Sequence, residues 1–169
     1  MSVKRILVVD DSKAARLVLR RMLQEQDLTV DLAESGEGAL HALASQQPDA
    51  ILMDHTMPGM DGLQTVQAIR ARPEWQIIPV AMYTSMESEG YAEQARNAGA
   101  ITVLPKPATP ETLKAVLQQL SEARIAAQQA QTKVVQFKNA PSTPTGGTPV
   151  VSGLNQQQIE AIIRQQVEQ

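Results

Sequence analysis

The chain has 169 residues and a formal net charge of −3 from scattered acidic and basic side chains, which suits one packed domain with an appendage and argues against a nucleic-acid-binding surface. It has no cysteines, so disulfides and thiolate metal sites are excluded and a cytoplasmic location is expected. Aromatic residues are only 2% of the chain, so a stacking site for a flavin or for single-stranded nucleic acid is not expected.

Short apolar segments alternate with helical patterns along most of the chain. The first apolar segment, residues 6–9, is too short for a signal peptide or a membrane span and is typical of a buried strand. A helix with Ala15, Leu19 and Leu23 on one face follows it, and Thr109 and Pro110 are predicted to open the last helix as N-cap and first residue. The remaining predicted strands are 28–33, 50–53, 77–83 and 101–104, and the helices between them are 36–44, 63–69 and 91–97.

Five strand–helix pairs predict an α/β fold, a doubly wound five-stranded parallel sheet with helices on both faces. In such sheets the functional site lies at the carboxyl ends of the strands. Each polar residue found at those ends has an ordinary explanation as a helix cap, a turn residue or an exposed lysine. Their occurrence at four strand ends together favours a functional site. The residues are Asp10, Asp11, Asp54, Thr84, Ser85 and Lys106.

This set of side chains indicates phosphoryl chemistry. Three carboxylates brought together raise one another's pKa unless a cation lies among them. Mg²⁺ is the expected ion, because it prefers oxygen ligands and leaves coordination positions for phosphate oxygens. Asp54 could then attack a phosphoryl group and form an acyl phosphate. Lys106 would offset the charge of the phosphoryl oxygens, and Thr84 would hydrogen-bond one of them.

Four motifs carry a resemblance to a known family: VVDDS at 8–12, MDHTMPGMDG at 53–62, YTS at 83–85 and PKP at 105–107. Over roughly residues 4–120 the chain resembles the receiver domain of bacterial two-component response regulators, in particular the chemotaxis regulators. The resemblance implies a flavodoxin-like strand order, 2-1-3-4-5. It also implies that Asp54 accepts a phosphoryl group from a histidine kinase or a phosphotransfer protein, and that the output is contact with a downstream protein.

The resemblance further implies a role for each residue of the site. Asp11, Asp54 and the main-chain carbonyl of Thr56 would bind Mg²⁺, and Asp10 would reach the ion through water. Thr84 and Lys106 would contact the phosphoryl group. The peptide bond between Lys106 and Pro107 would be cis.

The chain departs from the family pattern at Val103, where many receivers have a Tyr or Phe that swings inward on phosphorylation. We therefore expect phosphorylation to change the helix around Tyr91 only modestly. The two histidines, His41 and His55, are expected to face solvent.

Other functions remain open on the sequence. A Mg²⁺-dependent hydrolase of the haloacid-dehalogenase type also uses an aspartyl nucleophile, but it would have Asp-x-Asp where this chain has Asp10-Asp11-Ser12. A receiver that only relays phosphate or acts as a scaffold, and one that never accepts phosphate, are further alternatives. A DNA-binding transcription factor is not expected, because the residues after 122 are few and carry no basic cluster. We therefore expect a signalling switch with slow self-dephosphorylation rather than a metabolic enzyme.

The predicted domains are a receiver at 1–122, an extension of the last helix at 123–138, a Pro/Gly/Ser/Thr-rich linker at 139–153 and a short amphipathic helix at 154–169. Apolar residues at heptad spacing predict one helix to about Lys138 and a coiled-coil homodimer. The short last helix is expected to dock on a partner or on its own receiver, and no membrane insertion is expected. The heptad positions are Leu113, Val116, Leu120, Ala123, Ala127, Ala130, Val134 and Phe137.

Overall fold

The computed structural model describes residues 3–85 and 88–138, and for 132–138 it describes the helical backbone alone. The chain divides into two units, residues 1–131 and 132–169, and the first unit contains the predicted site. The predicted linker, 139–153, and the predicted short helix, 154–169, lie outside the described residues.

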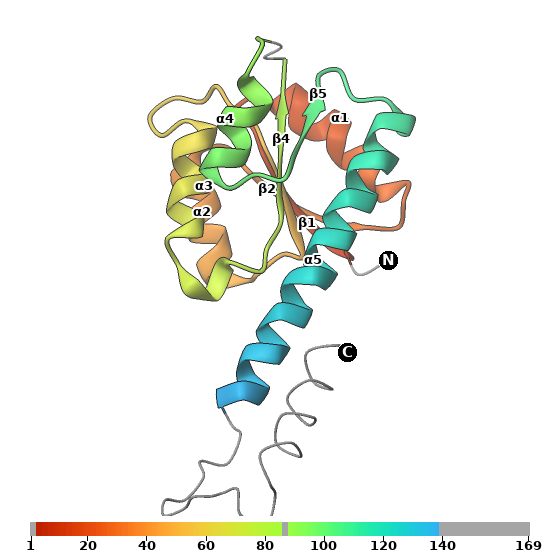
Figure 1. The fold of residues 1–169 in the computed structure, drawn as a ribbon. Helices are drawn as coiled ribbons and strands as arrows, with labels where there is room; N and C mark the ends of the chain where they lie inside the picture. Colours follow the sequence, from red (N-terminus) through yellow and green to blue (C-terminus); the bar gives the residue numbers. More distant parts are fainter. Residues whose placement is uncertain (1–2, 86–87, 139–169) are drawn as a thin grey trace, which may run out of the picture. The chain divides into compact units, whose positions relative to one another are not determined.

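One five-stranded parallel sheet forms the centre of the first unit (Figure 1), with the strand order β2-β1-β3-β4-β5. This confirms the predicted fold and strand order. The predicted start of the fourth strand at residue 77 is too early. Residues Pro73–Trp75 instead form a short 3-10 helix, η1, and Pro79 has no N–H to donate within a strand ladder. The strands are β1 (Arg5–Val9), β2 (Thr29–Ala33), β3 (Ala50–Met53), β4 (Val80–Thr84) and β5 (Thr102–Pro105).

The α-helices cover both faces of the sheet (Figure 1). Residues of α1 and α5 pack with Ile6 and Val8 of β1 on one face, and residues of α2, α3 and α4 pack with Leu7 and Val9 on the other. The alternation along β1 is that of a strand buried on both sides. The helices are α1 (Lys13–Gln24), α2 (Gly36–Ser45), α3 (Gly62–Arg70), α4 (Tyr91–Ala98) and α5 (Pro110–Lys138).

The caps of the helices decide which polar residues near the strand ends are structural. Ser12, and not Asp11, caps α1 by accepting a hydrogen bond from the backbone N–H of Ala15. Asp61 caps α3 in a reciprocal capping box with Gln64. These caps assign a helix-capping role to Ser12 and Asp61, which leaves Asp11 outside the caps.

Helix α5 is continuous from Pro110 to Lys138, the last residue that the structure describes, which confirms the predicted continuous helix over that range. It faces the core as far as Leu120 and Ser121, and Ile125 is 42% exposed. Beyond Leu120, Arg124 still contacts the receiver, because its guanidinium lies 3.2 Å from a carboxylate oxygen of Asp49, the residue before β3. None of the helices in the described part of the chain is both long and apolar enough to cross a membrane.

Candidate functional site

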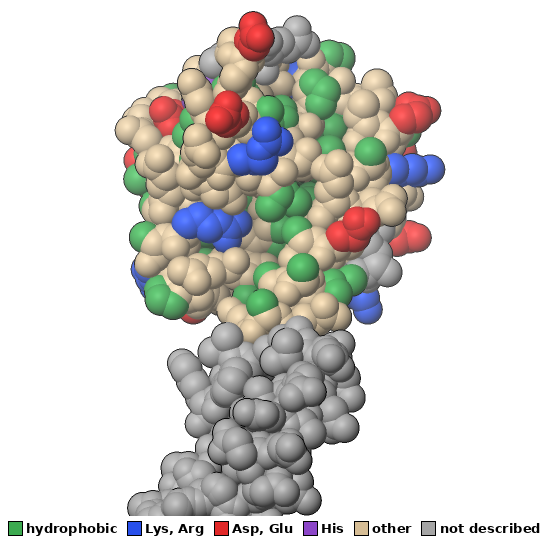
Figure 2. All heavy atoms as spheres, viewed as in Figure 1, with side chains coloured by type: hydrophobic (Ala, Val, Ile, Leu, Met, Phe, Trp, Pro, Cys, Tyr) green, Lys and Arg blue, Asp and Glu red, His purple; other side chains and the backbone are tan. Residues whose placement is uncertain are grey.

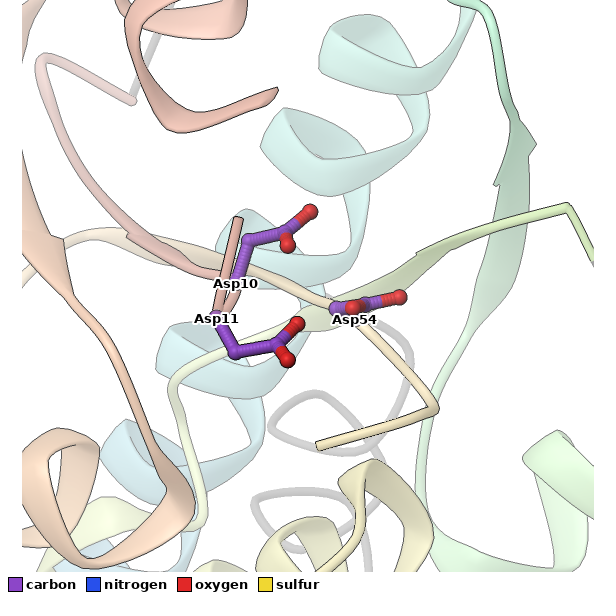
Figure 3. Close-up of side chains that lie close together, drawn as sticks. All are labelled: Asp10, Asp11 and Asp54. Carbon is purple, nitrogen blue, oxygen red and sulfur yellow. The ribbon is translucent and has the colours of Figure 1, made fainter. Parts of the chain in front are cut away.

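The carboxyl ends of β1 and β3 bring three carboxylates together. Val9 and Met53 are paired in register, so Asp10 and Asp54, which follow them, lie next to each other. Potential ligand oxygens of Asp10, Asp11 and Asp54 all lie within 4.8 Å of one another, and Figure 3 shows the three side chains extending from the neighbouring strand ends to the same side. Asp10 and Asp54 are buried, whereas Asp11 is exposed.

Lys106 directly follows β5, an edge strand of the sheet, and its side chain reaches this cluster. Its Nζ lies 2.7 Å from Oδ2 of Asp10 and 3.2 Å from Oδ1 of Asp54. Burial alone would lower the pKa of Lys106, but the hydrogen bond to Asp10 and the charges of Asp54 and Asp10 outweigh it and raise the pKa. The ammonium is therefore protonated and bridges the two buried carboxylates. The bond between Lys106 and Pro107 is cis.

The electrostatics of Asp54 reflect burial and crowding. Burial raises the pKa of Asp54, and the charge of Asp10 raises it further. Lys106 and the backbone N–H of His55 lower the pKa without cancelling the rise. Within the described residues, Lys106 is the only cation in an ion pair with these carboxylates. Three carboxylates against one ammonium leave an excess of negative charge, and a hard divalent cation such as Mg²⁺ fits that donor set.

The other predicted site residues lie at the same end of the sheet. Thr84 is buried at the end of β4, and its carbonyl accepts a hydrogen bond of 3.0 Å from the backbone N–H of Lys106. Ser85 follows it and is exposed. Thr56 is exposed in the loop between β3 and α3. The structure thus brings the predicted strand-end residues to one place, as the parallel topology requires.

The loop from Asp54 to Gly62 is closed tightly against α3. The backbone N–H of Gly62 donates to the His55 carbonyl at 2.8 Å. A Cβ at position 62 would overlap the Asp54 carbonyl oxygen and lie 2.8 Å from Cε of Met82. Only glycine fits where α3 starts this close to the Asp54 backbone.

Two further contacts at the site involve residues that the sequence analysis did not assign. The hydroxyl of Tyr91, the first residue of α4, lies 3.1 Å from Nδ1 of His55, so the expectation that His55 faces solvent is wrong. Arg16 on α1 is buried and donates to the Asp10 carbonyl at 2.7 Å. Its spacing from Leu19 and Leu23 places Arg16 on the buried face of α1, and that spacing was the available signal. No comparable pattern links His55 to Tyr91.

Comparisons with known proteins agree with this geometry. The family described as "Response regulator receiver domain" matches residues 6–118. A response regulator named MprA from Mycolicibacterium vanbaalenii is 39% identical over 116 residues, which are 69% of this chain and 49% of that protein. The MprA of Mycobacterium ulcerans is 41% identical over 116 residues, again 69% of this chain and 49% of that protein. The chain therefore spans about half the length of the curated relatives it matches.

Two solved structures show the extent of the structural likeness. The chemotaxis protein CheY4 of Vibrio cholerae is 32% identical with a TM-score of 0.66, covering 70% of this chain and 98% of CheY4. A fusion of the yeast Spc42 trimeric coiled coil to another solved structure is 27% identical with a TM-score of 0.70. That match covers 96% of this chain and 91% of the fusion.

Proposed function

The chain belongs to the response regulator receiver domain family, and from that premise we propose that it is a phosphorylation-switched signalling protein. A histidine kinase or a phosphotransfer protein donates the phosphoryl group, Asp54 accepts it, and the output is contact with a downstream protein. The observation that carries the proposal is the cluster of Asp10, Asp11, Asp54 and Lys106 at one end of the sheet.

Asp54 is the nucleophile of the reaction we propose. One oxygen of its carboxylate attacks the phosphorus atom, and the bond from phosphorus to the donor's imidazole nitrogen breaks. The nitrogen keeps the electron pair and takes up a proton, and an acyl phosphate forms on Asp54. Placement of Asp54 directly after the buried strand β3 holds this oxygen on a rigid part of the fold.

Mg²⁺ suits the same cluster. Asp11, Asp54 and the main-chain carbonyl of Thr56 are the proposed direct ligands, and Asp10 is the proposed ligand through water. When bound, Mg²⁺ supplies positive charge that offsets the carboxylates and the phosphoryl oxygens. The excess of carboxylates over the single ammonium of Lys106 supports this assignment.

Lys106 and Thr84 stabilise the transferred group in this proposal. The Lys106 ammonium already bridges Asp10 and Asp54, so a phosphoryl group on Asp54 lies within its reach while the bond to Asp10 persists. Thr84 ends the strand beside β5 and hydrogen-bonds a phosphoryl oxygen. Both contacts favour the transition state because they place positive charge and a donor where negative charge spreads.

Labelling of the purified protein with acetyl phosphate tests the chemistry. Intact-mass spectrometry should show one added phosphoryl group that requires Mg²⁺, and Asp54→Asn should abolish it. Asp27→Asn is the matched control, because Asp27 is exposed in a turn with φ of 62°, a conformation that asparagine tolerates well. A label that survives Asp54→Asn refutes the assignment. Continuous release of phosphate over many turnovers would favour the hydrolase alternative instead.

We further propose that two copies of the chain associate through α5. The helix continues past its last core-facing residues, and Ala126, Ala130 and Ile125 are exposed on it. Light scattering on the full chain tests the proposal. Ala127→Glu with Ala130→Glu should reduce the mass, whereas Ala115→Glu, on the receiver part of α5, should not.

The downstream partner we propose is a protein in the cytoplasm and not DNA. Figure 2 shows basic and acidic side chains interspersed on the visible face, without one large positive patch. The basic residues after position 122 are scattered along the sequence, which is unlike a DNA-binding segment. A pulldown with and without beryllofluoride, which mimics the phosphoryl group, should capture the partner, and a mobility-shift assay should show no DNA binding.

A further inference from the structure

A side-chain contact between His55 and Tyr91 joins the loop after Asp54 to α4. Tyr91 is the first residue of α4 and is only 2% exposed. Its hydroxyl lies 3.1 Å from Nδ1 of His55, and the two rings meet edge to face, with centroids 5.2 Å apart and planes at 87°. The geometry combines a hydrogen bond with a favourable aromatic packing arrangement.

His55 is the residue through which this contact reaches the site. It directly follows Asp54 and directly precedes Thr56. Its backbone N–H donates to the Asp54 carboxylate, which is one cause that lowers the pKa of that group. Its carbonyl accepts from Gly62 at 2.8 Å. The main chain of His55 is therefore held by the site and by α3, and its ring is held by α4.

The hydroxyl of Tyr91 is suited to be the donor in this contact. Burial raises the pKa of Tyr91 to about 12, with smaller contributions from the charges of Asp54 and Asp61. The hydroxyl therefore remains protonated at neutral pH and has a hydrogen to donate to Nδ1 of His55.

We propose that Tyr91 is a positioning residue for the phosphoacceptor loop: through His55 its hydroxyl fixes the backbone from Asp54 to Thr56 and links the state of Asp54 to α4. The inference rests on the proposed function of that site. The Tyr91–His55 contact connects α4 to the site without an aromatic residue at position 103. Val103 is half-buried and packs against the same apolar cluster as Tyr91. The sequence led us to expect little change in α4, and the Tyr91–His55 contact leads to the opposite expectation.

The link acts equally in both directions. If the Tyr91–His55 contact favours the loop geometry that binds Mg²⁺, then Mg²⁺ must favour the contact by the same factor. One hydrogen bond of this kind corresponds to a change in affinity of roughly three- to tenfold. Phosphorylation of Asp54 would act on α4 through the same bond.

Fluorine NMR of protein labelled with 3-fluorotyrosine can test the link, because the chain has two tyrosines and so gives two resonances. Tyr83 reports on the site itself, since the Lys106 Nζ lies 4.9 Å from the centre of its ring. Tyr91 reports on α4. The Tyr83 resonance remains in Tyr91→Phe, so the Mg²⁺ affinity of that variant can be measured by titration without any phosphorylation.

We expect Tyr91→Phe and His55→Leu each to weaken Mg²⁺ binding by roughly three- to tenfold, and the double variant to be no weaker than either single one. His55→Asn should retain near-normal affinity, because its amide oxygen can accept from the Tyr91 hydroxyl in place of Nδ1. Ala95→Gly is the control for α4 stability, since Ala95 is buried on α4 and is separate from the site. It should destabilise the protein without changing Mg²⁺ affinity. Beryllofluoride with Mg²⁺ should shift the Tyr91 resonance in the wild type, and much less in His55→Leu.

Three results would overturn the inference. Tyr91→Phe could bind Mg²⁺ as the wild type does, the two single effects could add in the double variant, or the Tyr91 resonance could shift equally in His55→Leu. A wild-type protein that neither binds Mg²⁺ nor accepts a phosphoryl group from acetyl phosphate would overturn the proposed function and the inference together. A wild type that does both, beside a Tyr91→Phe variant that does both equally well, would overturn the inference alone.

Discussion

Replacement of Gly62 by alanine should damage both the stability of the protein and the site. The new Cβ would overlap the Asp54 carbonyl oxygen and lie 2.8 Å from Cε of Met82. The methionine side chain can rotate away, but the carbonyl belongs to the backbone that carries the phosphoacceptor, so the loop itself must shift. Overpacking of this kind costs about 1–3 kcal/mol, against a gain of about 0.5–1 kcal/mol from replacing glycine in a helix. The difference is a net loss of up to about 2.5 kcal/mol, and the overlap with a backbone atom places the expected loss in the upper half of that range.

The same shift moves Asp54 relative to Asp11 and Lys106. A displacement of about 1 Å at a reacting group can reduce the rate about 100-fold, so labelling by acetyl phosphate should fall by up to that factor. Urea unfolding followed by the fluorescence of Trp75 measures the stability, because the single tryptophan is 4% exposed and becomes solvated on unfolding. Gly38→Ala in α2 is the control, since the nearest atom to its Cβ is Oγ of Ser35 at 3.2 Å. Wild-type stability together with wild-type labelling in Gly62→Ala would refute the reasoning.

Three further predictions concern charges that are buried or half-buried. In urea titrations, Arg70→Met should reduce the free energy of unfolding by about 2–4 kcal/mol, because the Arg70 guanidinium donates to the carbonyls of four residues. The control is Arg21→Met at an exposed site, which should change the free energy of unfolding by less than about 0.5 kcal/mol. Burial and the charge of Asp10 raise the pKa of Asp54, so the Asp54 carboxyl stays protonated to higher pH in the folded state than in the unfolded chain. The stability of the Mg²⁺-free protein should therefore fall as pH rises through the folded-state pKa. Thermal unfolding between about pH 4 and pH 8 should show this fall in the wild type and a smaller fall in Asp54→Asn; equal profiles would contradict it. Arg124→Met removes the ion pair to Asp49 and should cost about 1 kcal/mol in urea unfolding, and no loss would show that the pair does not stabilise the start of the helical extension.

The continuation of α5 beyond the core is a feature that the local sequence pattern can predict. The heptad spacing and the lack of Gly or Pro from Leu113 onward predict a helix to about Lys138, and the chain is helical as far as it is described, to Lys138. Both properties are local, because each residue's helical preference and its neighbours three and four positions away decide them. What the exposed part of this helix binds is a property of a second surface, so the coiled-coil dimer stays a prediction.

The site divides in a similar way. Asp10, Asp54, Thr84 and Lys106 could be assigned because each lies at the end of a strand or directly after it, and parallel strands place their carboxyl ends at one edge. Arg16 could have been assigned from its place on the buried face of α1. The Asp10 carbonyl, which Arg16 binds, could not have been assigned, because every residue has a main-chain carbonyl and a pattern of side chains does not distinguish one from another.

The sequence by itself determined the order of the strands and helices along the chain, the residues at the strand ends and the continuation of the last helix beyond the core. These features follow from periodicity and from the small set of topologies that parallel strands allow. Only the tertiary structure decided that Tyr91 contacts His55 and that α3 begins against the Asp54 carbonyl. The same holds for Arg70, which donates to one carbonyl directly after α4 and to three in or shortly after η1. Such contacts join residues far apart in the chain and depend on how two elements are rotated and spaced, which core packing sets to within fractions of an ångström.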